Sequence, residues 1–373
     1  TKIIYLTIIN LLVLLILLFD SLYFRYYNRI PSIYVFQQRD NVQGLGPSIL
    51  GAIQTQDIIL ILPTIIFLIV GLWIYRLQAK RYFMFTIGLV ILSLLITSLQ
   101  PVKIYAQGIS LTKRSTSLTF LSYYGILGAH ILDSSLAVTS NKGMKLNASQ
   151  KEFVEKQLTH HYPVTKYKSL EGIAKGFNVI MIQTESLQNF VINKSINGQP
   201  ITPNLNKLLN NSFYFNHFYA QTAEGNSSDA ELLTNTSLYP VASGSTYFRF
   251  PNDDYFSLGK MLKKDGYQVA AFHGDEADFW NRAQIYPHLG FNDFHSIETF
   301  KQNDLIGMGL SDKSFFRQSL PIIEKQKQPF YNFMITLSSH TPFKIPKKDQ
   351  SLQLTGGLEN TVLGDYIQSI HYT

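Results

Sequence analysis

The chain has 373 residues, enough for about two to three domains at roughly 150 residues each. Hydrophobic residues make up 46% and charged residues only 15%, which is too apolar for a disordered protein and too poor in charge for an ordinary soluble one. Cysteine is absent, which excludes disulfides, thiolate nucleophiles and Cys-ligated metal sites. The net charge of +7 suits an anionic lipid or polymer and equally a nucleic acid, so charge alone selects no partner.

Long apolar runs in the N-terminal third predict membrane-spanning helices at about 3–19, 58–75 and 83–99. The first run would be roughly 26 Å long as a helix, close to the ~30 Å hydrocarbon core of a bilayer. The alternative, buried helices of a soluble core, is disfavoured because three such runs with aromatic and basic flanks rarely occur in one soluble domain. A cleaved signal peptide fits poorly, since no small-residue cleavage pattern follows the first run and two further runs remain.

The connector between the second and third runs carries three cations, Arg76, Lys80 and Arg81. Cytoplasmic loops are enriched in Lys and Arg, so this hairpin turn is predicted to lie on the cytoplasmic side. Residues 20–56 and everything after Leu99 are then predicted to be extracellular. The sequence therefore predicts a multi-pass protein of the cell membrane with its C-terminal domain outside.

Residues 100–175 mix polar stretches with a more apolar, partly helical segment at 118–132. We interpret them as an extracellular linker between the membrane and the following domain. The chain opens with Thr1-Lys2 and enters the first apolar run without an initiator Met. This suggests a fragment of a longer protein.

A second domain at 176–373 is indicated by short apolar runs that alternate with helical patterns. The runs at 178–182, 267–272 and 330–335 are typical of strands in a parallel sheet covered on both faces. The pattern at 257–264 is typical of a helix between two of them. The sequence therefore predicts an α/β domain.

Acidic and imidazole side chains follow each predicted strand. Glu185 follows the first, His273 and Asp275 follow the second, and His340 follows the third. Each alone could be a turn residue or a helix cap, but α/β sheets bind ligands beyond the carboxyl ends of their strands, where these residues would meet. Glu185 is the most informative, because a carboxylate that closes a buried strand is costly unless it is paired or bound to a metal.

The segment 225–233 is predicted to be a loop that enters a helix. Ser228 and Glu231 match a capping box, which gives Ser228 a structural role. Ser227 would then lie just ahead of the helix, where unpaired backbone N–H groups and the helix dipole favour a phosphate. With a divalent cation shared with Glu185 as its activator, the Ser227 hydroxyl could attack phosphorus.

Trp280 and Arg282 follow the second predicted strand, in the sequence Phe-Trp-Asn-Arg. Arg282 offers the bidentate fork that suits a phosphate. The alternative is a half-buried tryptophan with an arginine stacked on it.

Together these motifs resemble the lipoteichoic acid synthase family, the membrane-anchored phosphoglycerol transferases of Gram-positive bacteria in the alkaline phosphatase and sulfatase superfamily. The resemblance covers nearly the whole chain, and the order and spacing of the motifs are highly specific. The motifs that carry it lie at 178–186, 225–231, 272–275, 279–282 and 336–343.

This resemblance implies that Glu185 is a ligand of a catalytic Mn²⁺, with Mg²⁺ as the alternative ion. It implies that Ser227 is both the nucleophile and a metal contact, although the family usually has threonine there. The family's adjacent Asp and His ligands would lie beyond Thr373, so the metal site is expected to be incomplete within this chain. The residues that would line the glycerol phosphate pocket are His273, Asp275, Trp280, Arg282 and His340.

The implied reaction has two steps. The Ser227 hydroxyl attacks the phosphorus of phosphatidylglycerol, and the glycerophosphoryl group then passes to a glycolipid or polyglycerol phosphate acceptor, the growing lipoteichoic acid. No nucleic-acid partner is expected. Alternatives are a primase that adds the first glycerol phosphate, a phosphoethanolamine transferase, and a non-catalytic membrane protein that binds anionic polymer. A sulfatase is disfavoured because Ser227 lacks the C/S-x-P-S-R context of the formylglycine precursor.

Overall fold

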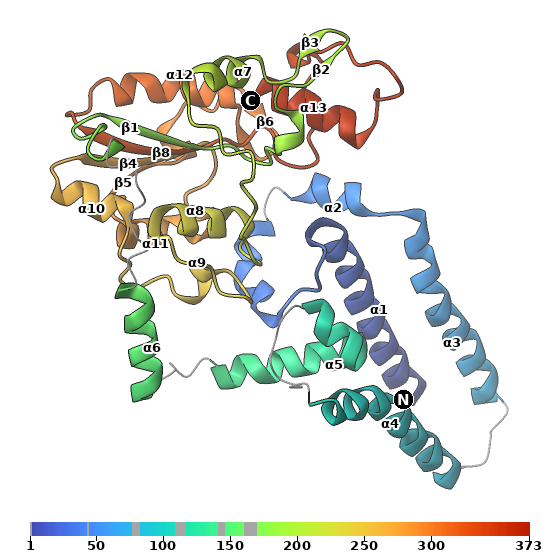
Figure 1. The fold of residues 1–373 in the computed structure, drawn as a ribbon. Coiled ribbons are helices and arrows are strands. Elements are labelled where there is room, and N and C mark those ends of the chain that lie inside the picture. The colour runs from blue at the N-terminus through green and yellow to red at the C-terminus, as the bar shows by residue number, and fades with distance from the viewer. Residues whose placement is uncertain (1, 43–44, 77–82, 109–116, 141–145, 160–169) are drawn as a thin grey trace. The chain divides into compact units, whose positions relative to one another are not determined.

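The computed structural model describes every residue except 1, 43–44, 77–82, 109–116, 141–145 and 160–169 (Figure 1). The chain divides into two compact units, Thr1–Ser135 with Val241–Ser245, and Leu136–Pro240 with Thr246–Thr373. The helices of the first unit are α1 (Lys2–Tyr27), α2 (Gly46–Ala52), α3 (Ile58–Arg76), α4 (Phe83–Ala106) and most of α5 (Ser117–Ser140).

The three predicted apolar runs form the helices α1, α3 and α4. Among the described residues, one helical segment is long and apolar enough to cross a membrane, namely Ile4–Tyr27. The other two runs carry shorter apolar stretches, Thr55–Val70 and Ile91–Ala106. The multi-pass arrangement is therefore not confirmed, and two cations of the predicted cytoplasmic turn, Lys80 and Arg81, lie outside the described residues.

Two pairs of ionisable side chains connect helices within the first unit. Arg25 Nη1 donates to Asp57 Oδ2 at 2.8 Å, which links α1 to the turn directly before α3. Asp20 Oδ2 lies 2.8 Å from His130 Nε2, which links α1 to α5. Apolar side chains such as Leu15, 61% exposed, lie on the outside. This inversion of the usual soluble pattern is the one that a lipid environment favours.

The segment predicted as a linker is largely helical where it is described. The predicted partly helical stretch 118–132 lies within α5, which is interrupted at Gly125, where φ is +66°. A positive φ is readily available to glycine because it has no Cβ. Another helix, α6 (Ala148–Thr159), follows in the second unit. Whether 100–175 acts as a linker stays a prediction.

A four-stranded parallel sheet organises the second unit, as the sequence predicts. Gln183 of one strand and His273 of another both pair with Ile335 of the strand between them. The three strands therefore end at the same level. The strands, in spatial order, are β1 (Val179–Gln183), β8 (Phe330–Ile335), β4 (Gln268–His273) and β5 (Asp293–His295).

Short hairpins and helices complete the second unit. The hairpins pair β2 (Ser195–Ile196) with β3 (Gln199–Pro200), and β6 (Leu305–Ile306) with β7 (Gly309–Leu310). The remaining helices are α7 (Pro203–Leu208), α8 (Asn226–Thr236), α9 (Thr246–Arg249), α10 (Leu258–Lys264), α11 (Arg282–Ile285), α12 (Asp312–Ile323) and α13 (Val362–Tyr372). The predicted helix 257–264 is α10, and the Ser257 hydroxyl caps its first turn.

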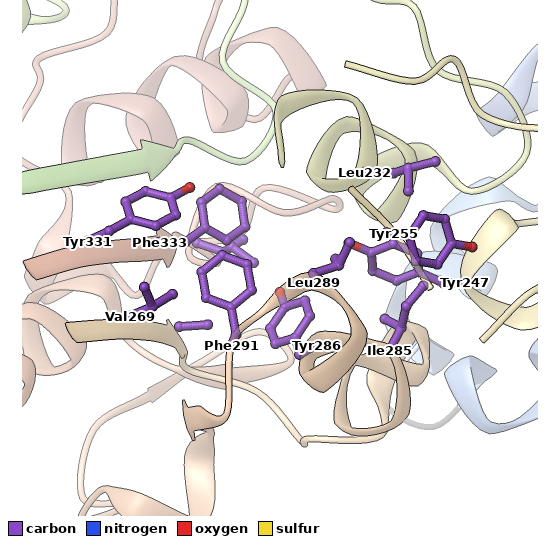
Figure 2. Close-up of a cluster of buried hydrophobic side chains, with 12 residues drawn as sticks. Leu232, Tyr247, Tyr255, Val269, Ile285, Tyr286, Leu289, Phe291, Tyr331 and Phe333 are labelled. Carbon is purple, nitrogen blue, oxygen red and sulfur yellow. The ribbon is translucent and has the colours of Figure 1, made fainter. Parts of the chain in front are cut away.

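The core of the second unit lies on both faces of the two central strands. On one face, Tyr331 and Phe333 of β8 form a cluster with Phe291, with Leu232 of α8 and with Ile285 of α11 (Figure 2). Leu258 and Leu262 of α10 pack against this cluster. On the other face, β4 and β8 pack against Phe315 and its neighbours on α12. For these strands the predicted burial on both faces is confirmed.

The edge strand β1 differs from this prediction. Met181 packs against the core, but Ile180 and Ile182 are each 49% exposed. Alternate residues of a strand point to opposite faces, so only one face of β1 is covered by the described chain. Its continuous apolar run therefore predicted more burial than the described part of the chain provides.

Phe333→Ala is expected to lower the free energy of unfolding by about 3–5 kcal/mol, because it removes a fully buried ring and leaves a cavity. Phe256→Ala, at a ring that is 72% exposed, is the matched control and should change stability little. Denaturant titration of both variants measures the difference. Equal losses would contradict the placement of the core.

Candidate active site

The strongest contact among the predicted site residues joins Glu185 and Ser227. Glu185 lies two residues beyond the end of β1, and Ser227 lies in the first turn of α8. The Ser227 hydroxyl donates to Glu185 Oε2 at 2.9 Å. The side-chain amide of Gln183 donates to the Ser227 carbonyl at 3.2 Å. The end of the strand and the start of the helix are therefore held together by two bonds.

The loop after β8 fixes the backbone of Glu185. Its N–H donates to Thr336 Oγ1 at 2.9 Å, and its carbonyl accepts from Ser339 Oγ at 2.6 Å. The Ser186 hydroxyl donates to the other carboxylate oxygen, Oε1, at 3.1 Å. With both backbone groups bonded and Oε1 occupied, Oε2 is held toward Ser227.

Asp312, at the start of α12, anchors the loop that carries His340. Its carboxylate accepts the backbone N–H of Leu337 at 2.7 Å and that of Ser338 at 2.9 Å. Burial raises the pKa of this carboxyl group, and the loop N–H groups act in the opposite direction. Sequence reasoning missed Asp312, although its place directly after a capping serine, Ser311, was a usable signal.

The two predicted site histidines, His273 and His340, each direct Nδ1 at a backbone carbonyl. Nδ1 of His273 lies 3.1 Å from the Ile335 carbonyl, and Nδ1 of His340 lies 2.8 Å from the Thr341 carbonyl. A carbonyl only accepts, so Nδ1 carries the proton in each ring. Burial, with a further contribution from the Arg282 charge, lowers the pKa of His273 well below its usual value. His273 is therefore neutral at neutral pH, with a lone pair on Nε2.

Arg282 forms a buried ion pair with Glu231. Its Nη2 donates to Glu231 Oε1 at 2.7 Å, and Tyr286 donates to Oε2 at 2.8 Å. The guanidinium carbon also lies 5.8 Å from the ring centroid of Phe279, so the arginine does meet an aromatic ring. Sequence reasoning missed this partner because it assigned Glu231 to Ser228.

The predicted capping box at the start of α8 is wrong. Gly225 is the N-cap and makes no side-chain cap bond, and the Ser228 hydroxyl donates back to the Gly225 carbonyl at 2.7 Å. Asp229 accepts the Gly225 N–H at 2.9 Å instead. Ser227 therefore lies inside the first turn of the helix and not ahead of it. The structural role expected for Ser228 is consistent with its complete burial.

Asp275 and Trp280 occupy constrained positions. One carboxylate oxygen of Asp275, Oδ1, accepts the Glu276 N–H at 2.8 Å, whereas Oδ2 is buried and has no hydrogen-bond partner within the described chain. Burial raises the pKa of this carboxyl group. Trp280 and Asn281 both have positive φ, +59° and +57°, which is uncommon for residues with a side chain. Such strain often marks functional sites.

The structure brings the predicted residues together in two groups. Glu185 and Ser227 are in direct contact, while Arg282 and His340 are close enough to act electrostatically on both His273 and Asp275. Trp280 is connected to the second group through the chain, two residues before Arg282. All of them follow strand ends or begin helices at the carboxyl edge of the sheet.

The fit of a divalent cation rests on Glu185 and Ser227. Their adjacent oxygens are the donor type that Mg²⁺ and Mn²⁺ prefer. Within the described part of the chain, no group of three or more His, Asp or Glu residues could complete a metal site. The residues present therefore fit two positions of a cation's coordination shell.

Comparison with known proteins agrees with this architecture. Residues 177–373 match the family model described as sulfatase, and residues 1–146 match the lipoteichoic acid synthase N-terminal domain. The chain is 35% identical to lipoteichoic acid synthase 1 of Bacillus subtilis (strain 168), an alignment covering 98% of this chain and 58% of the relative.

Two solved structures are also similar. The crystal structure of the lipoteichoic acid synthase LtaP from Listeria monocytogenes is 38% identical, with a TM-score of 0.53, over 54% of this chain and 50% of that chain. The integral membrane protein lipooligosaccharide phosphoethanolamine transferase A (EptA) from Neisseria meningitidis is 12% identical, with a TM-score of 0.50, over 97% of this chain and 66% of that chain. The second likeness shows the fold alone.

The chain therefore belongs to the sulfatase family, with a parallel sheet and candidate site residues at its carboxyl edge. Within that family it is similar to the lipoteichoic acid synthases, and the resemblance predicted from its motifs is confirmed. The chain spans 58% of the length of the Bacillus subtilis relative.

Glu231→Ala is expected to lower the free energy of unfolding by about 3–5 kcal/mol, because it leaves the buried Arg282 charge unpaired. Replacing both partners, Glu231→Leu with Arg282→Met, should recover much of that loss. Asp254→Ala, which breaks an exposed pair with Lys260, is the control and should leave stability unchanged. Denaturant titrations of the three variants measure this, and a fully stable Glu231→Ala protein would contradict the pairing.

The low pKa of His273 predicts a pH dependence of stability. The folded state keeps this ring neutral, while the unfolded state takes up a proton below about pH 6.5. Stability is therefore complete above that pH and is lost as pH falls, by up to about 1.4 kcal/mol per pH unit. His273→Gln should lose less stability than wild type between pH 7 and pH 5 in chemical denaturation. Parallel losses in the two proteins would show that His273 is not the responsible group.

Proposed function

We propose that the protein carrying this chain is a phosphoglycerol transferase, which moves glycerol phosphate from phosphatidylglycerol to a growing lipoteichoic acid chain. The observation that carries this proposal is the 2.9 Å bond between Ser227 Oγ and Glu185 Oε2 at the carboxyl edge of the sheet. The family membership and the likeness to lipoteichoic acid synthases support it.

In the first step, the Ser227 oxygen attacks the phosphorus of phosphatidylglycerol. The bond from phosphorus to the diacylglycerol oxygen breaks, diacylglycerol leaves with a proton, and Ser227 becomes a glycerophosphoryl ester. Ser227 lies in the first turn of α8, where the positive end of the helix dipole favours the negative charge of the phosphoryl group. The hydrogen bond to Glu185 orients the hydroxyl.

In the second step, a terminal hydroxyl of the acceptor attacks the phosphorus of that ester. We assign its proton to Nε2 of His273, which is unprotonated in the neutral ring. The bond between phosphorus and the Ser227 oxygen then breaks, and the serine regains a proton. Arg282 and His340 hold the phosphate, and Asp275 and Trp280 hold the glycerol.

Glu185 and Ser227 are the residues we assign to a divalent cation, Mn²⁺ with Mg²⁺ as the alternative. A cation bound there would lower the pKa of the Ser227 hydroxyl and offset negative charge on the phosphoryl oxygens. Glu185 is suited to this role because its backbone is tied to the loop after β8, which keeps the carboxylate oriented.

We further propose that the helices before the catalytic domain anchor it to the outer face of the cell membrane. Support for a multi-pass arrangement comes from the apolar helix Ile4–Tyr27, the exposed apolar side chains of α3 and α4, and the three cations in the sequence 76–81. In this arrangement 100–175 is the extracellular linker and 176–373 the catalytic domain. The lipid headgroup of the donor and the catalytic domain would then be on the same side of the membrane.

Ser227→Ala is expected to abolish release of diacylglycerol from labelled phosphatidylglycerol in liposomes, a loss of at least about 1,000-fold. The assay uses the full-length natural protein, with and without Mn²⁺. Ser227→Thr should keep the activity, since threonine also supplies a hydroxyl.

The matched control is Ser319→Ala, which removes a buried α12 hydroxyl that has no partner in the described chain. It should leave the rate unchanged. Turnover by Ser227→Ala at the wild-type rate would place the nucleophile elsewhere, and no release by wild type under any metal would contradict the proposed donor.

A further inference from the structure

The turn that follows Glu185 has an unusual backbone conformation. Ser186 has a φ of +57°, in the left-handed region that residues with a side chain seldom occupy. Its hydroxyl donates to Glu185 Oε1 at 3.1 Å. The direction of the Glu185 carboxylate therefore depends on this turn, and a left-handed backbone of this kind persists only where neighbouring groups hold it.

The hydroxyl of Tyr366, a residue of α13, bonds to both ends of this turn. It donates to the Ser186 carbonyl at 3.0 Å and accepts the Gln188 N–H at 3.1 Å. A phenol has one proton to donate and lone pairs to accept, so a single hydroxyl serves both backbone groups. The turn directly after Glu185 is thereby connected to a residue 178 positions further along the chain than Gln188.

Tyr366 is itself held in place by packing. It is 5% exposed and lies in the apolar cluster that α13 forms with Val191 and Leu352. Its ring stacks on Phe190 with the ring centroids 5.7 Å apart, and it meets the ring of Phe343 edge-on at 5.2 Å. A hydroxyl on a packed side chain of a helix keeps its position more precisely than a group on a loop does.

This packing does not require the hydroxyl. A phenylalanine ring would fill the same space, and a buried hydroxyl costs free energy unless it is hydrogen-bonded. Burial raises the pKa of Tyr366, so the hydroxyl keeps its proton and remains a donor at neutral pH. The ring of Tyr366 therefore accounts for the packing, and the bonds to the turn account for its hydroxyl.

Two different elements thus determine the orientation of the Glu185 carboxylate. The loop after β8 bonds the backbone of Glu185 itself, and α13 bonds the turn that follows it. Carboxylates that ligate metals depend on such outer partners for their orientation, and the loss of one partner typically lowers metal affinity or activity about 10–100-fold.

We propose that Tyr366 is a positioning residue for Glu185, whose hydroxyl holds the left-handed turn and so keeps the carboxylate directed at Ser227 and at the cation that we assign there. The proposal rests on the proposed transferase function. Tyr366 acts through the turn and has no part of its own in the transfer steps. Loss of its hydroxyl should lower the cation affinity and kcat but not the binding of the lipid donor, because the phosphate and the glycerol are assigned to other residues.

Tyr366→Phe tests this role in the full-length natural protein, because it removes the hydroxyl and keeps the ring. We expect the Kd for Mn²⁺, measured by isothermal titration of the metal-free protein, to rise about tenfold, and kcat for diacylglycerol release to fall about tenfold. The KM for phosphatidylglycerol should stay within about twofold of the wild-type value. Tyr255→Phe is the matched control: it removes a hydroxyl that donates to the Phe250 carbonyl at 2.8 Å, and it should change neither the metal affinity nor the rate.

Amide hydrogen exchange separates positioning from a loss of structure. In Tyr366→Phe the Gln188 amide should exchange at least about tenfold faster, whereas the amides of β8 should exchange at the wild-type rate. A Gln188 amide that exchanges at the wild-type rate, or an unchanged Kd for Mn²⁺, would overturn the proposal. So would a loss of Mn²⁺ affinity with faster exchange throughout the sheet, because that would indicate a structural role for the hydroxyl.

The binding and exchange measurements need no turnover, which keeps them independent of the proposed function. If wild type released no diacylglycerol from phosphatidylglycerol, the proposed function would fail, and the Kd for Mn²⁺ and the exchange at Gln188 would still decide the role of Tyr366. A wild-type protein that binds no Mn²⁺ would overturn the cation assignment and this proposal with it.

Discussion

The parallel pairing of β8 with both β1 and β4 determines where the chemistry of this domain can take place. Because Ile335 pairs with Gln183 on one side and with His273 on the other, the three strands end at one level. The loops that carry Glu185, His273 and His340 then leave the sheet side by side. Every residue of β8 is buried, and its alternate side chains pack into the core on opposite faces, so a one-residue shift of this register would exchange the two sets and disrupt both halves of the core. The geometry of the site therefore depends on the core.

Buried polar groups hold the loops that follow the aligned strand ends in fixed positions. Asp312 holds the loop after β8 through its backbone N–H groups, and that loop in turn holds the backbone of Glu185. Arg282 is held by its ion pair with Glu231, a residue of α8. A buried ion pair often adds little net stability, but removing one partner is costly, so such pairs set positions more than they strengthen the fold. The same network orients the carboxylate toward the Ser227 hydroxyl.

Groups of both charge signs lie near Asp275 at the carboxyl edge of the sheet. The charges of Arg282 and His340 act on both His273 and Asp275, and a cavity that Asp275 lines is also lined by Glu276 and Glu298.

The strands β1, β4 and β8, the parallel sheet and the placement of Glu185, His273 and His340 after strand ends could all be predicted from the sequence. Apolar runs of strand length and the polar residues that end them are local patterns, visible along the chain. The pairing of Arg282 with Glu231 across 51 positions, the anchoring by Asp312, the three-residue strand β5 and the cavity beside Glu298 were decided only by the tertiary structure. They arise from contacts between segments that are distant in sequence. The periodicity of apolar residues is a local pattern, so it does not indicate which distant polar side chains will contact each other in the folded protein.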